Sequence, residues 1–553
     1  MNLNMDEKTV EIESGKTILD ALRKAGMDSI SLADRPLAAQ IGGEVFSLSY
    51  TPNKDTKMHL LRYGEEMGRR VYERTLQFVF IAAVRKLYPG ARVWVRYSLG
   101  SGLFITLSDP EVTFTEEITA SIEAQMRLLV RKGLPLERKR FSIKEAVEYF
   151  EKDGQKDKAD LLKWRRFSYF DLYQAEGHRD YFYGEMTPDT SYVDVFRLKH
   201  VWDGAVMLMM PRKDAPDVLA DCPELPKLHA VFHQSDEWGK LMKCDTVHQL
   251  NTAVESGSIR ELVRINEVLH ERMYAEAADK ILEKGAKAIM LAGPSSSGKT
   301  TSAHRLATQL RLHGQDPVML SLDDYYIDRD KILPDENGEI DLENINTLDI
   351  PRFKEDLAGL IRGEEVEVPE FDFKTGRRAP ESRRLQLRED QPVIIEGIHG
   401  LNPQLIGGVD ESKIFRVYVS ALATLNLDDH NRIRTTDIRI LRRLVRDYKT
   451  RNASMEETLG MWASVRRGEE KWIFPYQENA DILLNTTLLY EVSVLKKYVY
   501  PLLKEVTPQS KYYAMAVDIV KFLNYILDSD VEDEIPPTSI MREFIGGNTY
   551  YRK

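Results

Sequence analysis

Four residues just past the middle of the chain have the types and spacing of a phosphate-binding loop. The pattern G-x-x-x-x-G-K-[ST] is met by Gly293, Gly298, Lys299 and Thr300. Residues 287–292 form an apolar run that predicts a strand, and residues 299–313 predict a helix. This strand–loop–helix order favours a nucleotide cradle over the alternative, a structural turn rich in glycine and serine.

The predicted loop supplies each contact that a bound nucleotide needs. Its backbone amides and the start of the following helix point at phosphate oxygens. Lys299 neutralises the β and γ oxygens, and the Thr300 hydroxyl ligates Mg²⁺. We therefore predict an ATP contact from every residue of the loop: Gly293, Pro294, Ser295, Ser296, Ser297, Gly298, Lys299, Thr300 and Thr301.

Two acidic residues end the next predicted buried strands. Asp323 follows the run "PVMLSL", and Glu396 closes the run "PVII". Ligands bind at the carboxyl ends of strands in α/β folds, and Mg²⁺ commonly takes one or two carboxylates together with phosphates. Phosphoryl transfer to a hydroxyl also uses a carboxylate that orients or deprotonates that hydroxyl, and Asp323 is our candidate. A strand-end cap is the alternative interpretation of Asp323.

A helix with an arginine stripe follows further along the chain. In "TTDIRILRRLVRDYKTR" the spacing places one set of guanidinium groups on a single helical face: Arg439, Arg442, Arg443 and Arg446. Such a stripe is unstable unless an anion lies opposite, and the triphosphate is the predicted counterpart. An ordinary basic face and internal ion pairs are the alternatives.

The order of these motifs resembles the uridine kinase branch of the phosphoribulokinase/uridine kinase family. The resemblance covers residues from about 285 to 490, through "GPSSSGKTT", "SLDDYY", "LDIP", "VEVPEFDF", "PVIIEG" and "RRLVRD". It implies an α/β P-loop kinase fold with a five-stranded parallel sheet, whose fourth and fifth strands are "KIFRVYV" and "ADILLNT". It also implies ATP and Mg²⁺ as cofactors.

The resemblance assigns roles to individual residues of this chain. Lys299 matches the catalytic loop lysine, and the Mg²⁺ sphere matches Thr300, Asp323 and Glu396, with Asp323 also the base for a ribose 5′-hydroxyl. The nucleoside side matches Tyr326, Asp349, Phe371 and Arg443. The lid over the phosphates matches Arg446 and Arg451. A nucleoside is thus the implied small-molecule acceptor.

The acceptor hairpin departs from the family pattern. Where the family commonly has Tyr-Asp-Phe-x-x-His, this chain has "FDFKTG", so that Phe371 replaces the tyrosine and Gly376 replaces the histidine. A site without those hydrogen-bond partners cannot reject the wrong base. We therefore expect a nucleoside 5′-kinase with uridine or cytidine as the default acceptor. A kinase for another sugar-like alcohol and a nucleotide-gated module that binds RNA or the ribosome are the alternatives.

The N-terminal half resembles part of another family. Residues 1–62 are similar to the small α+β, ubiquitin-like TGS module of threonyl-tRNA synthetases, and residues 63–230 to their second additional domain, an α+β editing domain. The positions of its His and Cys zinc ligands fall here on Arg74, Phe78, Tyr183 and Thr187. We therefore expect a retained fold without the zinc site, and RNA is a candidate partner of this half.

Composition bounds the remaining expectations. The chain has 553 residues, a net charge of −11 and two cysteines, which favours a cytoplasmic protein in a reducing compartment. Neither a signal peptide nor a membrane span is expected, and a homo-oligomer is left open. The expected further units are a helical connector over 231–286, the kinase domain over 287–490 and a helical extension over 491–553.

Overall fold

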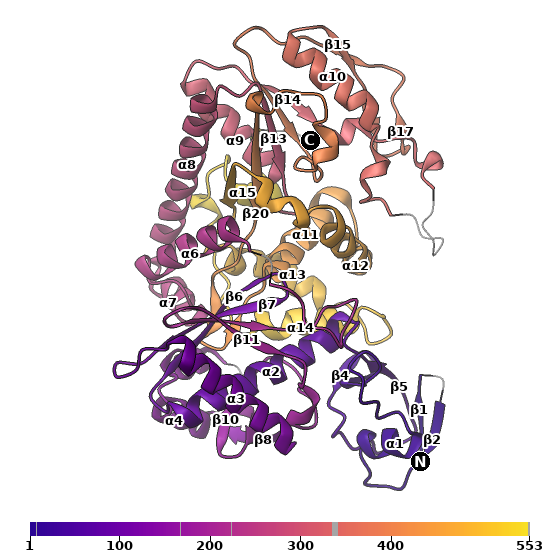
Figure 1. Ribbon diagram of the computed structural model, residues 1–553, viewed down its shortest axis with the longest axis vertical. Helices are drawn as coiled ribbons and strands as arrows, with labels where there is room; N and C mark the ends of the chain where they lie inside the picture. The colour runs from indigo at the N-terminus through magenta and orange to yellow at the C-terminus, as the bar shows by residue number, and fades with distance from the viewer. Residues whose placement is uncertain (7, 166, 223, 334–340, 551–553) are drawn as a thin grey trace.

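The computed structural model describes residues 1–553 except 7, 166, 223, 334–340 and 551–553. The molecule is elongated, with the N-terminal sheets at one end and a parallel sheet near the other (Figure 1). Among the described residues, every helix is too short or too polar to cross a bilayer.

The C-terminal half, for which a kinase is predicted and which is called the kinase half below, is built on a parallel sheet of five strands. In spatial order they are β14 (Val318–Ser321), β19 (Val393–Glu396), β13 (Ala288–Ala292), β20 (Ile414–Ser420) and β23 (Ile482–Asn485). All neighbouring pairs run parallel. The predicted fold class, an α/β P-loop kinase-like fold with five parallel strands, is confirmed.

The central strand explains why this segment is apolar throughout. All five residues of β13 are buried. Ala288 and Met290 pack into one hydrophobic cluster, and Ile289 and Leu291 pack into another. A strand with helices on both faces has no polar side, so its sequence is a continuous apolar run and does not alternate.

Helices cover both faces of this sheet. The helix after the phosphate loop is α9 (Lys299–Leu312), and the acceptor side carries α10 (Ile350–Arg362). The arginine stripe lies on α11 (Thr435–Arg451), which packs against α12 (Met455–Trp472) and α13 (Glu491–Leu503). The helix that was predicted over residues 299–313 is α9, and it ends one residue earlier, at Leu312.

The first unit of the chain is a small mixed sheet with one helix. Its strands lie in the order β2 (Lys8–Glu11), β1 (Asn2–Met5), β5 (Thr56–Leu61), β3 (Ala38–Ile41) and β4 (Glu44–Phe46). Helix α1 (Ile18–Ala25) is capped by Thr17 and ends at Gly26 in the left-handed conformation. The small α+β architecture agrees with the prediction.

A second α+β unit follows. Four antiparallel strands lie in the order β11 (Arg197–Trp202), β12 (Ala205–Met209), β7 (Gly102–Ser108) and β6 (Arg92–Leu99). They pack with α2 (Glu66–Leu87) and α3 (Glu116–Lys132). A smaller sheet contains β10 (His178–Asp180), β9 (Tyr169–Ala175) and β8 (Glu137–Ser142), beside α4 (Ile143–Lys152) and α5 (Lys156–Leu161).

Three helices connect this unit to the kinase half: α6 (Pro226–Leu241), α7 (Val247–Ser256) and α8 (Ile259–Lys284). Helix α8 reaches the start of β13 and packs against α9. The helical character expected for the connector is present. The bounds of the five predicted units themselves stay predictions.

A hairpin of the kinase half is buried against the second unit. It consists of β21 (Asn426–Asp428) and β22 (Asn431–Arg432). Lys158 on α5 forms ion pairs with Asp180 and, at 3.7 Å, with Asp428. The His430 Nδ1 lies 2.6 Å from an Asp180 carboxylate oxygen. Because these four side chains are almost fully buried, they form a charged network that joins the two halves.

We expect Lys158→Met to lower the free energy of unfolding by about 3–5 kcal/mol, because it leaves two buried carboxylates with less compensation. Lys156→Met is the matched control, since Lys156 lies on the same helix, is 79% exposed and pairs with Asp160 at the surface. That control should change stability by less than about 1 kcal/mol. Urea denaturation of both variants measures the difference, and equal losses would contradict a role for the network.

The C-terminal extension contacts both halves of the molecule. Helix α14 (Tyr513–Leu523) packs on the first unit, where a Cβ at Gly43 would lie 2.8 Å from the Tyr513 ring. Helix α15 (Ile540–Ile545) packs on α11 and α9 in the kinase half. The extension therefore packs on the first unit at one point and on the kinase half at another (Figure 1).

Candidate functional site

The phosphate loop joins the end of β13 to the start of α9. Gly298 has a φ of +85° in the left-handed region, which favours glycine. A Cβ at Gly293 would lie 2.1 Å from the Val419 carbonyl oxygen, so only glycine fits beside β20. The hydroxyls of Ser296 and Ser297 are buried without a hydrogen-bond partner among the described residues. Such orphaned groups indicate that the loop is shaped to receive a polar ligand.

Lys299 stands in the first turn of α9, as the pattern predicts. Its ammonium group donates to the Pro294 carbonyl at 3.3 Å, across the loop. Thr300, the next residue, is half-buried at the same helix end. The positive helix terminus and the ammonium group therefore lie together where the phosphates are predicted.

Asp323 and Glu396 end adjacent strands of the sheet. Asp323 lies in the short η3 turn (Leu322–Tyr325) directly after β14, and Glu396 is the last residue of β19 and pairs in register with Ser321. Burial raises the pKa of both carboxyl groups, and the Asp323 charge helps to raise the pKa of Glu396 to about 7. Lys299 opposes both shifts.

This carboxyl pair fits a divalent cation. Two partly buried acids that repel each other are stabilised by a cation between them, and Mg²⁺ accepts one or two carboxylates when phosphates complete its shell. In the part of the chain that the structure describes, no group of three or more His, Cys, Asp or Glu could hold a metal alone. A cation held by Asp323 and Glu396 would need phosphate or water oxygens to complete its shell.

Sequence reasoning missed another acid near this site, Glu343. Burial raises its pKa to about 7, with a further contribution from Glu469, while Arg443 and Lys299 oppose the shift. The residue comes from the segment before α10 and packs on α12, where a Cβ at Gly468 would meet its side chain. No local sequence pattern marks it.

Two arginines of the stripe are structural. Arg439 is fully buried, pairs with Glu469 and donates to the Ser295 carbonyl at 2.9 Å. Arg442 is also fully buried and pairs with Glu491 at 2.6 Å. The hypothesis that the whole stripe faces phosphate is therefore wrong for these two, because the anions opposite them are internal carboxylates. Arg439 instead supports the phosphate loop from behind.

Three further arginines of α11 share a single carboxylate: Arg443, predicted on the nucleoside side, and the predicted lid residues Arg446 and Arg451. Asp447 lies 2.8 Å from Arg446, 3.3 Å from Arg443 and 3.4 Å from Arg451. Arg443 also donates to the Ser295 hydroxyl at 2.7 Å, so that it reaches the phosphate loop. Three guanidinium groups on one carboxylate leave two positive charges uncompensated, which suits a polyphosphate.

Three of the four predicted acceptor residues, Tyr326, Asp349 and Phe371, lie close together. The Tyr326 ring centre is 5.6 Å from that of Phe371, and Phe373, which the sequence did not suggest, is 5.2 Å from Phe371. Asp349 caps α10 and accepts from Arg378 at 3.0 Å. Arg378 also donates to the Tyr326 carbonyl at 3.1 Å and is a second residue that sequence reasoning missed. One carboxylate oxygen of Asp349 therefore already accepts a hydrogen bond from Arg378.

Gly376 does not leave open space beside this cluster. Its φ is +68°, and a Cβ there would lie 2.6 Å from the Arg329 side chain. The Arg329 amide also donates to the Gly376 carbonyl at 2.9 Å. An arginine side chain therefore fills the region that a side chain at position 376 would enter.

The C-terminal extension reaches the phosphate loop. The Glu543 carboxylate accepts from the Thr301 hydroxyl at 2.7 Å and from its amide at 3.4 Å. Ile540 packs on Gly298, where a Cβ would lie 2.9 Å from its side chain. An acidic group therefore occupies the helix terminus at which ATP was predicted to bind. Nothing in the local sequence signals this contact.

The four residues that stand at the zinc-ligand positions of the editing domain contact other protein groups. Arg74 donates to the Glu185 carbonyl at 3.4 Å, and Tyr183 packs edge-on against Tyr525 at 4.9 Å. Phe78 lies against His178, and the Thr187 hydroxyl bonds with Thr75. Tyr525, two residues past the end of α14, thus packs directly beside Tyr183.

The two halves of the chain are similar to two different groups of known proteins. Residues 288–493 match the model of the Phosphoribulokinase / Uridine kinase family, so the C-terminal part carries a domain of that family. The N-terminal region is similar to threonine–tRNA ligases: that of Clostridium kluyveri is 30% identical over 156 residues, 28% of this chain and 24% of the ligase, and that of Clostridium novyi is 27% identical over 197 residues, 35% and 30%. The chain thus spans about a quarter of the length of these relatives.

Two solved structures resemble the chain at low identity. One is described as a possible uridine kinase from Bacillus stearothermophilus, with 18% identity and a TM-score of 0.27, covering 39% of this chain and 98% of that one. The other is the YGR205w protein, with 16% identity and a TM-score of 0.25, covering 36% and 86%.

Proposed function

We propose that the protein transfers the γ-phosphoryl group of ATP to a hydroxyl of a small sugar-like alcohol, with a nucleoside 5′-hydroxyl as the leading candidate. The observation that carries this proposal is the partly buried pair Asp323 and Glu396 beside Lys299. A protein that only holds a nucleotide does not need a free carboxylate with a raised pKa next to the phosphates. A transferase uses one to accept a proton.

The residues divide the reaction between binding and proton transfer. The loop amides, Lys299 and the lid arginines bind the phosphates. Thr300, Asp323 and Glu396 are the residues that would hold Mg²⁺, which neutralises phosphate charge when it is bound. Asp323 accepts the hydroxyl proton, the freed oxygen attacks the γ phosphorus, and the bond between that phosphorus and the β–γ bridging oxygen breaks to release ADP.

The acceptor side favours a nucleoside. Tyr326, Phe371 and Phe373 offer ring faces for a base, and Asp349 with Arg378 offers polar groups for ribose hydroxyls. Uridine and cytidine are the default acceptors. The Arg329 side chain behind Gly376 gives the base edge a different partner from the family histidine, so another sugar-like alcohol is the second candidate.

A panel of acceptors with ATP tests the proposal. Uridine, cytidine, adenosine, guanosine and simple polyols are each supplied, and ADP release is measured together with the phosphorylated product. We expect turnover with at least one nucleoside and a product carrying the phosphate at the 5′ position. Turnover with polyols alone would transfer the assignment to the second candidate, and no turnover with any hydroxyl would contradict both.

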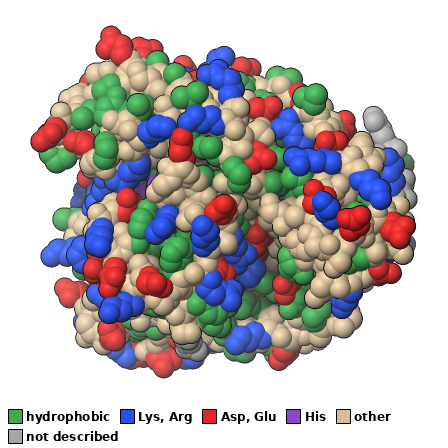
Figure 2. All heavy atoms as spheres, turned by 90° about the horizontal axis from the view of Figure 1, so that it is seen from below, with side chains coloured by type: hydrophobic (Ala, Val, Ile, Leu, Met, Phe, Trp, Pro, Cys, Tyr) green, Lys and Arg blue, Asp and Glu red, His purple; other side chains and the backbone are tan. Residues whose placement is uncertain are grey.

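RNA contact through the N-terminal half is a second proposed function, supported by the similarity to threonine–tRNA ligases. Acidic and basic side chains are interspersed over the face that Figure 2 shows, from the N-terminal end. This pattern favours a local site over a broad electrostatic surface. A filter-binding assay with tRNA tests it, and its outcome is independent of phosphoryl transfer.

A further inference from the structure

A cavity lies between the second unit and the C-terminal extension. It has a volume of about 420 Å³, which is in the range of small-molecule sites. One wall comes from β8, β9 and the loop after β10, and the other comes from the end of α13, from α14 and from the two residues after α14. The cavity is thus formed jointly by the second unit and the C-terminal extension.

The charged groups of this cavity do not cancel. Its two carboxylates, Asp171 and Glu185, are both paired with Arg138, and Asp171 is also paired with Arg140, so two guanidinium groups balance the two acids. The remaining cations are Arg165, Lys504 and Lys521, and none of them has a carboxylate within 4.0 Å among the described residues. Three uncompensated positive charges in a chain of net charge −11 indicate an anionic ligand.

Arg165 is held in place by neutral groups. Its guanidinium donates to the Tyr169 carbonyl at 3.0 Å and to the Tyr525 hydroxyl. It also lies over the rings of Phe170, at 4.7 Å, and Phe167, at 5.5 Å. None of these partners carries a negative charge, so the orientation of the cation is fixed while its charge remains available.

Aromatic rings form much of the remaining wall. Phe167 is 51% exposed at this site, although a large apolar side chain is normally buried. The other rings that line the cavity are Tyr169, Tyr173, Tyr181, Phe182, Tyr500 and Tyr525. Ring faces beside fixed cations suit a ligand that combines a flat aromatic part with an anion.

We infer that this cavity binds a nucleoside phosphate, with the base against the rings and the phosphate between Arg165, Lys504 and Lys521. The same chemistry is presented by a free nucleotide and by the terminal nucleotide of an RNA strand. The site is separate from the candidate kinase site, because it shares no residue with the phosphate loop, the carboxyl pair or the lid.

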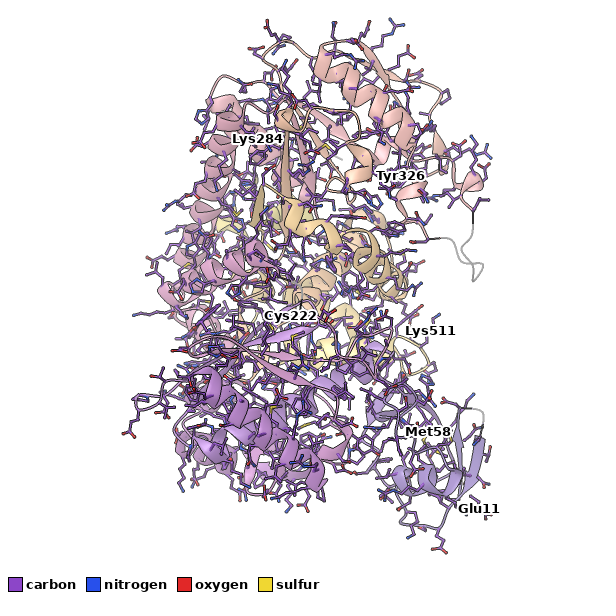
Figure 3. The ribbon with its side chains drawn as sticks, viewed as in Figure 1. Glu11, Met58, Cys222, Lys284, Tyr326 and Lys511 are labelled. Carbon is purple, nitrogen blue, oxygen red and sulfur yellow. The ribbon has the colours of Figure 1, made fainter. Side chains whose placement is uncertain are left out.

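Binding is measured in the full chain carrying Lys299→Ala, so that the phosphate loop contributes little. Calorimetric titrations use the monophosphates of adenosine, guanosine, uridine and cytidine, and in a second arm a single-stranded RNA hexamer. Lys504→Glu with Lys521→Glu reverses two exposed charges of the cavity. Lys511→Glu is the matched control, since Lys511 is exposed on the α13–α14 connection outside the cavity (Figure 3).

We expect saturable binding that weakens at least about tenfold in the double reversal and is unchanged in the control. Phe167→Ala should weaken nucleotide binding by a similar factor, because it removes a stacking face. Binding of monophosphates identifies a free nucleotide as the source. Binding of the hexamer alone, with the same dependence on Lys504 and Lys521, identifies an RNA end.

Two results would overturn the inference. One is the lack of binding of both the monophosphates and the hexamer to the Lys299→Ala chain. The other is binding that the double reversal leaves unchanged, which would place the ligand elsewhere. Neither result bears on phosphoryl transfer at Asp323, which the acceptor panel tests separately.

Discussion

Replacing Asp323 with Asn is expected to lower turnover by about 10²–10⁴-fold, because the amide cannot accept the acceptor's proton. Asn keeps the size of the side chain and its place in the η3 turn, so the fold should be retained. Circular dichroism and the thermal midpoint check the fold, and ADP release with the best acceptor measures the rate.

Two further measurements sharpen this result. Asp330→Asn is the control, since Asp330 lies seven residues away with a side chain that is 58% exposed and pairs with Arg377 at the surface. It should turn over at nearly the normal rate. The nucleotide-gated alternative makes the opposite prediction for Asp323→Asn, because binding of RNA needs no proton acceptor. Unchanged phosphoryl transfer in Asp323→Asn would remove Asp323 as the base.

The parts of the site that lie within one strand–loop–helix unit could be predicted from sequence. Gly298, Lys299 and Thr300 are adjacent, and their geometry follows from local backbone rules. Asp323 and Glu396 were predictable for a related reason, since the carboxyl ends of parallel strands meet at one edge of a sheet. The apolar run before Glu396 is buried on both faces, whereas in the edge strand β14 only Leu320 is fully buried.

The parts that could not be predicted depend on contacts between distant segments. Periodicity places Arg439 and Arg442 on one helical face, but it does not reveal that Glu469 and Glu491 lie opposite them. Those acids belong to other helices, and their approach depends on how α12 and α13 pack on α11. The same limit applies to Arg378, which approaches Asp349 only because the acceptor hairpin packs against η3.

The contact between Glu543 and Thr301 joins residues 242 positions apart, and it gives a second large expected effect. The carboxylate lies at the positive end of α9, where the amides of the phosphate loop converge. A phosphate group that binds there meets a negative charge and must break a charge-assisted hydrogen bond of about 1.5–3 kcal/mol. The extension therefore opposes nucleotide binding until α15 moves or Glu543 rotates away.

Glu543→Gln is expected to tighten ATP binding by about tenfold, which corresponds to about 1.4 kcal/mol, because the amide keeps a hydrogen bond to Thr301 without repelling phosphate. Glu505→Gln is the matched control, since Glu505 is exposed in the same extension and lies away from the loop. Calorimetric titration with a non-hydrolysable ATP analogue measures both. Weaker binding in Glu543→Gln would mean that the carboxylate supports the loop, in the way that Arg439 does, and does not compete with the nucleotide.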